Sequence, residues 1–185
     1  MLEIEIRSLL KNQEEFNQVK AYLDKNAKFL GKKHLKSFLF LKPYHLRIRF
    51  VRGNNHIIIT KKIGEFTDSA RREIENKISL NQLPLFVEKI KKQGFDECAE
   101  FETIRYVYEL DGLRVELNKI DLLGLIVEVE ALTNNEKEIP EYEDKIRNII
   151  NKLNIKELEP EKYKELVLKA YNKALKNIEE HSFEF

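Results

Sequence analysis

The sequence contains little cysteine, glycine or proline, and it contains no tryptophan. Cys98 is the only cysteine, which excludes an internal disulfide and favours a reducing, cytoplasmic environment. With 6 glycines and 4 prolines in 185 residues, the chain shows no low-complexity segment, no long linker and no internal repeat of solenoid length. Disulfide-rich and solenoid architectures are therefore excluded.

Long apolar runs and an excess of one charge are also missing. No run is long enough to cross a bilayer, and the start lacks the pattern of a signal peptide, so we expect a soluble cytoplasmic protein with no membrane partner. The 33 basic and 32 acidic residues nearly cancel, so nucleic acid is not an expected partner. Charged residues still make up 35% of the chain, which is well above the usual quarter. Any electrostatic function must therefore come from their local arrangement.

The abundant charges alternate with apolar residues, as expected for β-strands. In the run Glu3-Ile-Glu5-Ile-Arg7 the charged residues share one face of a strand and the apolar residues share the other. Similar alternation follows, with a hairpin turn signal at Asp111-Gly112. The further predicted strands lie within residues 29–51, where Pro43 separates two of them, and at 56–62, 71–75, 102–109, 113–118 and 125–130.

Helical patterns occupy the remaining segments. We predict helices at 12–26, with Asn12 as the N-cap, and at 83–93, ending before Gly94. Two more follow Pro140 and Pro160, the last with an apolar stripe that reaches residue 178, before a frayed tail at 183–185. We expect a single domain over 1–185, with the strands and two helices in 1–132 and the C-terminal helices in 140–180.

The apolar faces predict how these elements pack. Amphipathic helices must bury their stripes against the apolar strand faces, which places the helices outside the sheet. If about eight antiparallel strands close into a barrel, the charged faces point into its lumen. This pattern fits an α+β fold with a closed or nearly closed antiparallel β-barrel that forms a charged tunnel. The alternative is an open sheet whose charged face is solvated and carries cross-strand ion pairs.

A charged lumen has chemical consequences because isolated buried ions cost several kcal/mol each. Clustered carboxylates suit a hard divalent cation such as Mg²⁺, and Arg and Lys suit phosphate oxygens. The combination predicts a polyphosphate site. The residues on the charged strand faces are Glu3, Glu5, Arg7, Arg47, Arg49, Lys62, Arg71, Glu73, Glu75, Arg105, Arg114, Glu116, Glu128 and Glu130. His34, His45, His56 and His181 show no zinc-site spacing and are expected to be surface or strand-face histidines.

The order of these motifs resembles the CYTH family of triphosphate tunnel metalloenzymes, which includes class IV adenylate cyclases and thiamine triphosphatases. The family's Glu-x-Glu-x-Lys start is matched by residues 3–7, and its Leu-Gly segment before Glu-x-Glu is matched by 123–130. Between them lie matches to its Arg-x-Arg, Thr-x-Lys and Arg-x-Glu-x-Glu strands, at 47–49, 60–62 and 71–75.

The resemblance implies a tunnel that holds Mg²⁺ or Mn²⁺ and a triphosphate such as ATP, thiamine triphosphate or inorganic triphosphate. It implies metal binding by Glu3, Glu5, Glu128 and Glu130, and phosphate binding by Arg7, Arg47, Arg49, Lys62, Arg71 and Arg105. Glu3, Glu5 and Lys62 are the candidate catalytic residues. The supporting residues are Glu73, Glu75, Arg114, Glu116 and Asn118.

Three positions depart from the family pattern: Arg7 and Thr103 stand where Lys is usual, and Asn118 stands where Asp is usual. Our leading hypothesis is an enzyme, either a triphosphate hydrolase or a cyclase that attacks the α-phosphate of ATP with its ribose 3′-hydroxyl. The departures motivate a second hypothesis, a non-catalytic triphosphate- or polyanion-binding protein of the same fold. We expect a monomer or a homodimer.

Overall fold

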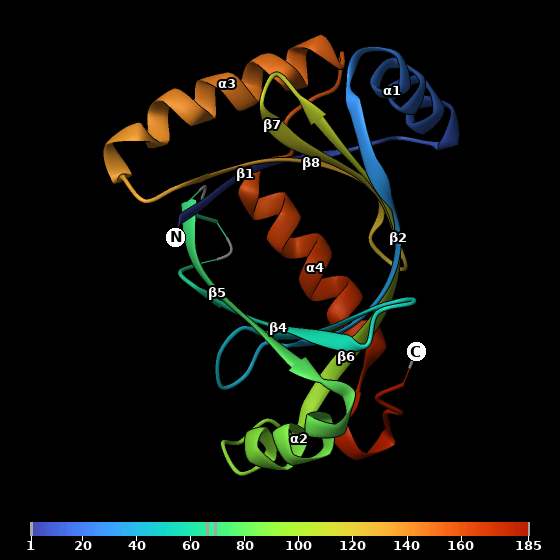
Figure 1. Ribbon diagram of the computed structural model, residues 1–185, viewed down its shortest axis with the longest axis vertical. Coiled ribbons are helices and arrows are strands. Elements are labelled where there is room, and N and C mark those ends of the chain that lie inside the picture. The colour runs from blue at the N-terminus through green and yellow to red at the C-terminus, as the bar shows by residue number, and fades with distance from the viewer. Residues whose placement is uncertain (1, 66, 69, 185) are drawn as a thin grey trace.

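The computed structural model describes residues 2–65, 67–68 and 70–184, in which a single sheet curves around a central space with helices packed about it (Figure 1). The strands are β1 (Leu2–Leu9), β2 (Lys28–Phe40), β3 (Leu46–Val51), β4 (His56–Ile63), β5 (Ala70–Ser79), β6 (Glu97–Leu110), β7 (Leu113–Ile120), β8 (Gly124–Thr133) and β9 (Leu175–Asn177). The α-helices are α1 (Gln13–Asn26), α2 (Leu83–Lys91), α3 (Ile139–Lys152) and α4 (Pro160–Ala174).

The sheet closes on itself. Its strand order is β2-β3-β4-β5-β1-β8-β7-β6, and β2 pairs with β6 along most of its length, so the first and last strands of this order are neighbours. Every pairing in the ring is antiparallel. The predicted α+β fold with a closed barrel of eight antiparallel strands is therefore confirmed.

The alternation along β1 decides which side faces out. Ile4 and Ile6 are buried in a cluster that also contains Phe16 and Val19 of α1 and Ile146 of α3. Burial of such apolar side chains contributes roughly 1.5–3 kcal/mol each. Because side chains alternate in a strand, this packing turns the acidic face of β1 toward the lumen.

Helix α4 lies across one end of the barrel, where it is seen behind the ring of strands (Figure 1). It begins at Pro160, a residue suited to the first turn of a helix. Ala170 and Tyr171 pack against Ala99 and Phe101 in a small apolar cluster at this end of the barrel. One face of the last helix therefore lies next to the lumen.

The C-terminal segment differs from the sequence expectation. Helix α4 ends at Ala174, and the next three residues form β9, which pairs with the start of β6. Strand β6 begins earlier than predicted, because its residues 97–99 pair with β9 and its residues 99–101 pair with β2. Ile178, expected on the helical stripe, is buried in a cluster beside α2 instead. The predicted frayed tail is wrong for Phe183, whose ring centroid lies 4.5 Å from that of Phe38, while residue 185 lies outside the described residues.

No helix in the described part of the chain is both long enough and apolar enough to cross a membrane.

Candidate active site

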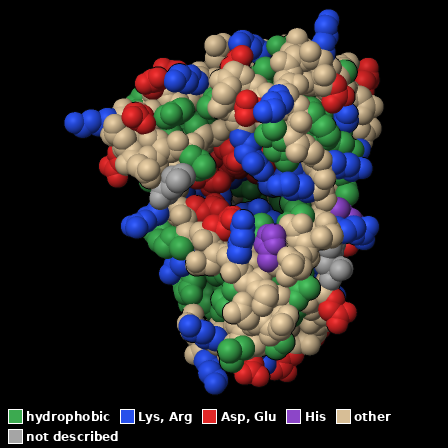
Figure 2. All heavy atoms as spheres, in the orientation of Figure 1, with side chains coloured by type: hydrophobic (Ala, Val, Ile, Leu, Met, Phe, Trp, Pro, Cys, Tyr) green, Lys and Arg blue, Asp and Glu red, His purple; other side chains and the backbone are tan. Residues whose placement is uncertain are grey.

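The lumen contains a cavity of about 620 Å³. In the space-filling view, acidic and basic side chains gather around a hollow at the centre of the molecule (Figure 2). All fourteen charged residues that the alternating pattern placed on one face line this cavity, from Glu3 on β1 to Glu130 on β8. The last predicted supporting residue, Asn118, is fully buried beside them.

The acidic wall of the cavity comes from β1 and β8. Glu5 stands directly opposite Glu130 in the ladder, and Arg7 stands opposite Glu128. Burial and the neighbouring Glu5 raise the pKa of Glu3 to about 7. Burial and the carboxylates of Glu116 and Glu5 raise the pKa of Glu130 to about 8. Like charges directly across a strand pair are destabilising, so this wall favours an added cation.

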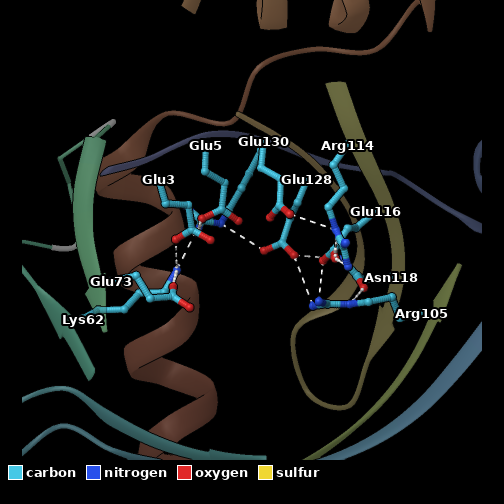
Figure 3. Close-up of polar contacts among 11 residues, drawn as sticks. Glu3, Glu5, Lys62, Glu73, Arg105, Arg114, Glu116, Asn118, Glu128 and Glu130 are labelled. Atoms are coloured by element: carbon cyan, nitrogen blue, oxygen red, sulfur yellow. Dashed lines mark hydrogen bonds and ion pairs between the residues drawn. The ribbon is translucent and has the colours of Figure 1, made fainter. Parts of the chain in front are cut away.

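Cations of the protein already contact the acidic wall (Figure 3). The Lys62 Nζ lies 2.5 Å from a Glu3 carboxylate oxygen and 3.2 Å from one of Glu73. Arg7 pairs with Glu5, and its Nε lies 3.2 Å from Glu128. Although burial opposes the shift, Arg7 and Lys62 hold the pKa of Glu5 well below its usual range. Strands β1, β4, β5 and β8 thus meet in one ion-pair network.

The same network continues through Glu128 onto β6 and β7. Arg105 lies 2.5 Å from Glu116, and its Nε donates a 2.8 Å hydrogen bond to the Asn118 side-chain oxygen. The Asn118 amide nitrogen donates in turn to Glu128 at 2.9 Å. Arg114 pairs with both Glu116 and Glu130 at 2.8 Å. The side-chain amide of Asn118 therefore accepts a hydrogen bond from a cation and donates one to an anion. An ionised Asp could accept from Arg105 but could not donate to Glu128, because its carboxylate has no hydrogen to donate.

The basic wall lies on β3. Arg47 and Arg49 point into the cavity, and within the described residues their buried Nε atoms have no hydrogen-bond partner. Burial and the nearby guanidinium groups of Arg47 and Arg105 lower the pKa of Arg49 to about 9. Buried charges are normally paired or hold a ligand, so this wall has the character of an anion site. Arg71, on β5, also lines the cavity and is buried.

The structure adds cavity residues that the sequence reasoning did not select. His45 was expected to be a surface or strand-face histidine and was not selected for the site; it lines the cavity, where burial and the cations Arg47 and Arg71 lower its pKa to about 3. Tyr163 belongs to the apolar stripe that the sequence predicts for the last helix and that was expected to pack in the core, yet its ring lies against Arg7. Lys33 on β2 lines the cavity too. His45 precedes Arg47 by two positions, so the two-residue period of a strand could have placed its side chain on the same face as Arg47. No comparable sequence pattern indicated that Tyr163 lies in the cavity.

The carboxylates of β1 and β8 are the candidate ligands for a divalent cation. Among the described residues, no group of three or more His, Cys, Asp or Glu side chains converges as metal ligands do. The donor chemistry nevertheless fits, because Glu3, Glu5, Glu128 and Glu130 provide carboxylate oxygens on adjacent strands. An ion held there would replace contacts now made by Lys62 and Arg7.

The sequence and the fold of this chain are similar to those of known proteins. The family model of the CYTH domain matches residues 1–163. The structure of the PH1819 protein from Pyrococcus horikoshii OT3 is 26% identical, with a TM-score of 0.73, and the match covers 90% of this chain and 98% of that one. No curated protein matches the chain.

Two more distant structures show the same fold. A candidate adenylate cyclase from Vibrio parahaemolyticus is 16% identical with a TM-score of 0.67, and the match covers 91% of this chain and 98% of that one. A candidate adenylyl cyclase from Hippeastrum, described as having a dominant triphosphatase activity, is 16% identical with a TM-score of 0.57. That match covers 85% of this chain and 90% of the other.

Proposed function

Because this chain belongs to the CYTH family, we propose that it is a divalent-metal-dependent enzyme that acts on a triphosphate. The observation that carries the proposal is the pair of half-buried arginines, Arg47 and Arg49, which line the cavity and whose buried Nε atoms have no hydrogen-bond partner among the described residues. Two adjacent guanidinium groups match the closely spaced oxygens of a phosphate chain, since each can bind two oxygens at once.

The residues of the basic wall and those of the acidic wall have different proposed roles. Phosphate oxygens would be bound by the arginines Arg47, Arg49, Arg71 and Arg105. Arg7 and Lys62 would join them by exchanging their present carboxylate partners for phosphate oxygens. Glu3, Glu5, Glu128 and Glu130 would hold Mg²⁺ or Mn²⁺. Such an ion supplies charge neutralisation at the phosphate oxygens.

The supporting residues keep these groups oriented. Glu73 contacts Lys62 at 3.2 Å, and Glu116 contacts Arg105 at 2.5 Å, so each cation is held from its side before a substrate binds. Fixed groups of this kind stabilise the charge that develops at phosphorus without reorganising during the reaction. Glu75 is exposed at the edge of the cavity and stands farther from this network.

One cavity of this kind serves two reactions. In hydrolysis, water attacks a phosphorus atom and a phosphate or pyrophosphate leaves; in cyclisation, the ribose 3′-hydroxyl of ATP attacks the α-phosphorus and pyrophosphate leaves. The cations stabilise the leaving phosphate chain in both cases.

A product assay tests the proposal and separates the two reactions. The protein is incubated with ATP, thiamine triphosphate or inorganic triphosphate, each with Mg²⁺, with Mn²⁺ or with a chelator. We expect metal-dependent release of phosphate or pyrophosphate, and cyclic AMP would identify the cyclase reaction. Tight triphosphate binding with no product under any metal would identify a non-catalytic binding protein. Failure of every triphosphate to raise the melting temperature would exclude both.

A further inference from the structure

Strand β5 lies at one side of the ring of strands (Figure 1), and much of one of its backbone edges is unpaired. On one side it pairs with β4 from residue 72 to residue 79. On the other side, within the described residues, it pairs with β1 only at residues 70–72. The edge of β5 over residues 73–79 therefore faces no other strand in the described part of the chain. An edge of this kind is a template for pairing with another strand.

The hydrogen-bond pattern shows which backbone groups point out from this edge. In β4, the N–H of Lys62 donates to the carbonyl of His45, on the side that faces β3. Because backbone groups alternate sides along a strand, the odd-numbered residues of β4 face β5, where they pair with even-numbered residues. The odd-numbered residues of β5 therefore direct their N–H and C=O groups away from β4. The N–H of Ser79 agrees, since it donates to the side-chain oxygen of Gln82 and not to a strand.

The sequence of the edge is complementary to a second copy of itself. Two antiparallel copies related by a two-fold axis at Asn76 place Glu75 of each chain opposite Lys77 of the other. The same register places Ile74 of each chain opposite Ile78 of the other, on the outer face of the sheet. Glu75 and Lys77 are exposed and form no ion pair with the described residues. Ile74 is 40% exposed, which is high for an isoleucine within a strand.

The neighbouring registers lack this match. An axis at Glu75 would place that carboxylate opposite its own copy, and an axis at Lys77 would place two ammonium groups opposite each other. Opposite charges directly across a strand pair are stabilising, and like charges are destabilising. Edges that resist pairing often carry lysine, which repels a second copy. The edge of β5 instead carries both signs, spaced so that one register attracts.

We propose that two copies of this chain form a symmetric dimer through this edge, with β5 paired antiparallel to its own copy about Asn76. The outward direction of the odd-numbered residues lets each pair of Glu75 and Lys77 exchange two backbone hydrogen bonds. The side chains of Glu75 and Lys77 line the cavity, so the new ion pairs lie at the edge of both cavities. Each chain thereby contributes an ammonium group to the cavity edge of the other. The inference does not depend on the reaction that the cavity catalyses.

Sedimentation velocity tests the pairing, with the unmodified protein and two charge reversals. The strand pair is short, so we expect a monomer–dimer equilibrium with a dissociation constant of about 1–100 µM, which protein concentrations of about 1–300 µM cover. Glu75→Lys and Lys77→Glu each place like charges across both pairs, and each should weaken the dimer by roughly tenfold or more. An equimolar mixture of the two variants should form a dimer, because every lysine then meets a glutamate.

The mixture makes the result specific to this register, since two variants that had lost their fold would not associate in a dimer when combined. Lys169→Glu, at an exposed position on α4 outside the cavity lining, is the control and should dimerise like the unmodified protein.

Three outcomes would overturn the proposal. They are an unmodified protein that stays monomeric at every concentration, which would leave the edge to a strand of another protein or to none, a dimer that persists in both single variants, and a mixture that stays monomeric. Should either charge reversal not fold, as judged by circular dichroism, Asn76→Lys takes its place, because it puts two ammonium groups at the two-fold axis. A dimer of Asn76→Lys as tight as that of the unmodified protein would then overturn the register.

Discussion

The guanidinium carbon of Arg7 lies 4.1 Å from the centre of the Tyr163 ring, so the first strand and the last helix meet inside the cavity. Arg7 is also paired with Glu5 and Glu128, which places a ring and two carboxylates around one cation. The backbone of Leu158, just before α4, donates a 2.7 Å hydrogen bond to the Arg7 carbonyl. The position of α4 is therefore coupled to the orientation of a candidate phosphate-binding arginine.

The Arg7–Tyr163 contact predicts that an aromatic ring at position 163 affects activity. A cation–π contact of this kind is worth about 0.5–2 kcal/mol. Tyr163→Leu should therefore lower kcat/KM for the best triphosphate substrate by roughly threefold to thirtyfold, while Tyr163→Phe should retain it. Steady-state kinetics of both variants provide the measurement. Equal losses in the two variants would show that the hydroxyl, and not the ring, is the important group.

Arg49 and Arg105 should respond in opposite ways to the same substitution. Arg49 is a half-buried cation beside the cations Arg47 and Arg105, so Arg49→Met should stabilise the free protein and raise its Tm by a few degrees. The same change should shrink the Tm increase caused by inorganic triphosphate, because a phosphate-binding group is lost.

Arg105 is the matched control because its guanidinium group is paired with Glu116 and Asn118. Arg105→Met removes one of the two arginines that pair with the buried Glu116 and leaves Arg114 in place, so it should destabilise the protein by about 1–3 kcal/mol. Thermal unfolding with and without ligand measures both variants. A lower Tm for Arg49→Met in the free protein would contradict the view that Arg49 is retained for binding.

The acidic wall predicts a loss of metal-dependent turnover in Glu5→Gln. Glutamine keeps the shape of the side chain but removes a carboxylate that faces Glu130, so Mn²⁺ affinity should fall and the rate should drop by about a hundredfold or more. Mn²⁺ binding by electron paramagnetic resonance and the product assay provide the measurements. Glu3→Gln should behave in the same way.

Glu141→Gln on α3 is the control for these variants, since Glu141 is exposed, lies outside the cavity lining and pairs with Lys145 in the next helical turn. Its activity and Mn²⁺ affinity should match those of the unmodified protein. Full turnover in Glu5→Gln, with the fold intact, would remove Glu5 from the metal site.

The environment of His45 predicts that the free energy of unfolding decreases at acidic pH. Its pKa is lowered to about 3 by burial and by the cations Arg47, Arg71, Lys62 and Arg7, which belong to four different strands. Below pH 6.5 the unfolded chain binds a proton at this residue and the folded chain does not, so stability falls as the pH drops from about 6.5 toward 3.

The corresponding experiment compares urea unfolding of the unmodified protein and His45→Gln at pH 7 and pH 4.5. The variant should lose about 2 kcal/mol less stability over this interval, because it lacks the proton that only the unfolded chain takes up. Two equal pH dependences would show that His45 does not titrate differently in the folded and unfolded chains.

Local patterns in the sequence were sufficient to predict the strands and the charged wall. The two-residue period of Glu3, Glu5 and Arg7 assigns them to one face in any strand, and the apolar residues between them need a buried partner. The Asp111-Gly112 turn was equally clear, and both residues adopt positive φ values of 52° and 77°. These features depend on short-range geometry, so neighbours in the chain determine them.

The tertiary structure alone decided which strands are neighbours and what closes the end of the lumen. Closure depends on the pairing of β2 with β6, which joins residues such as Leu35 and Thr103 that are far apart in the chain. Alternation identifies the inward face of each strand but not its partner, since many pairings satisfy the same period. The same holds for Tyr163 and Val167, which line the cavity. An apolar stripe on a helix indicates that this face is buried, but only the packed fold determines which surface it packs against.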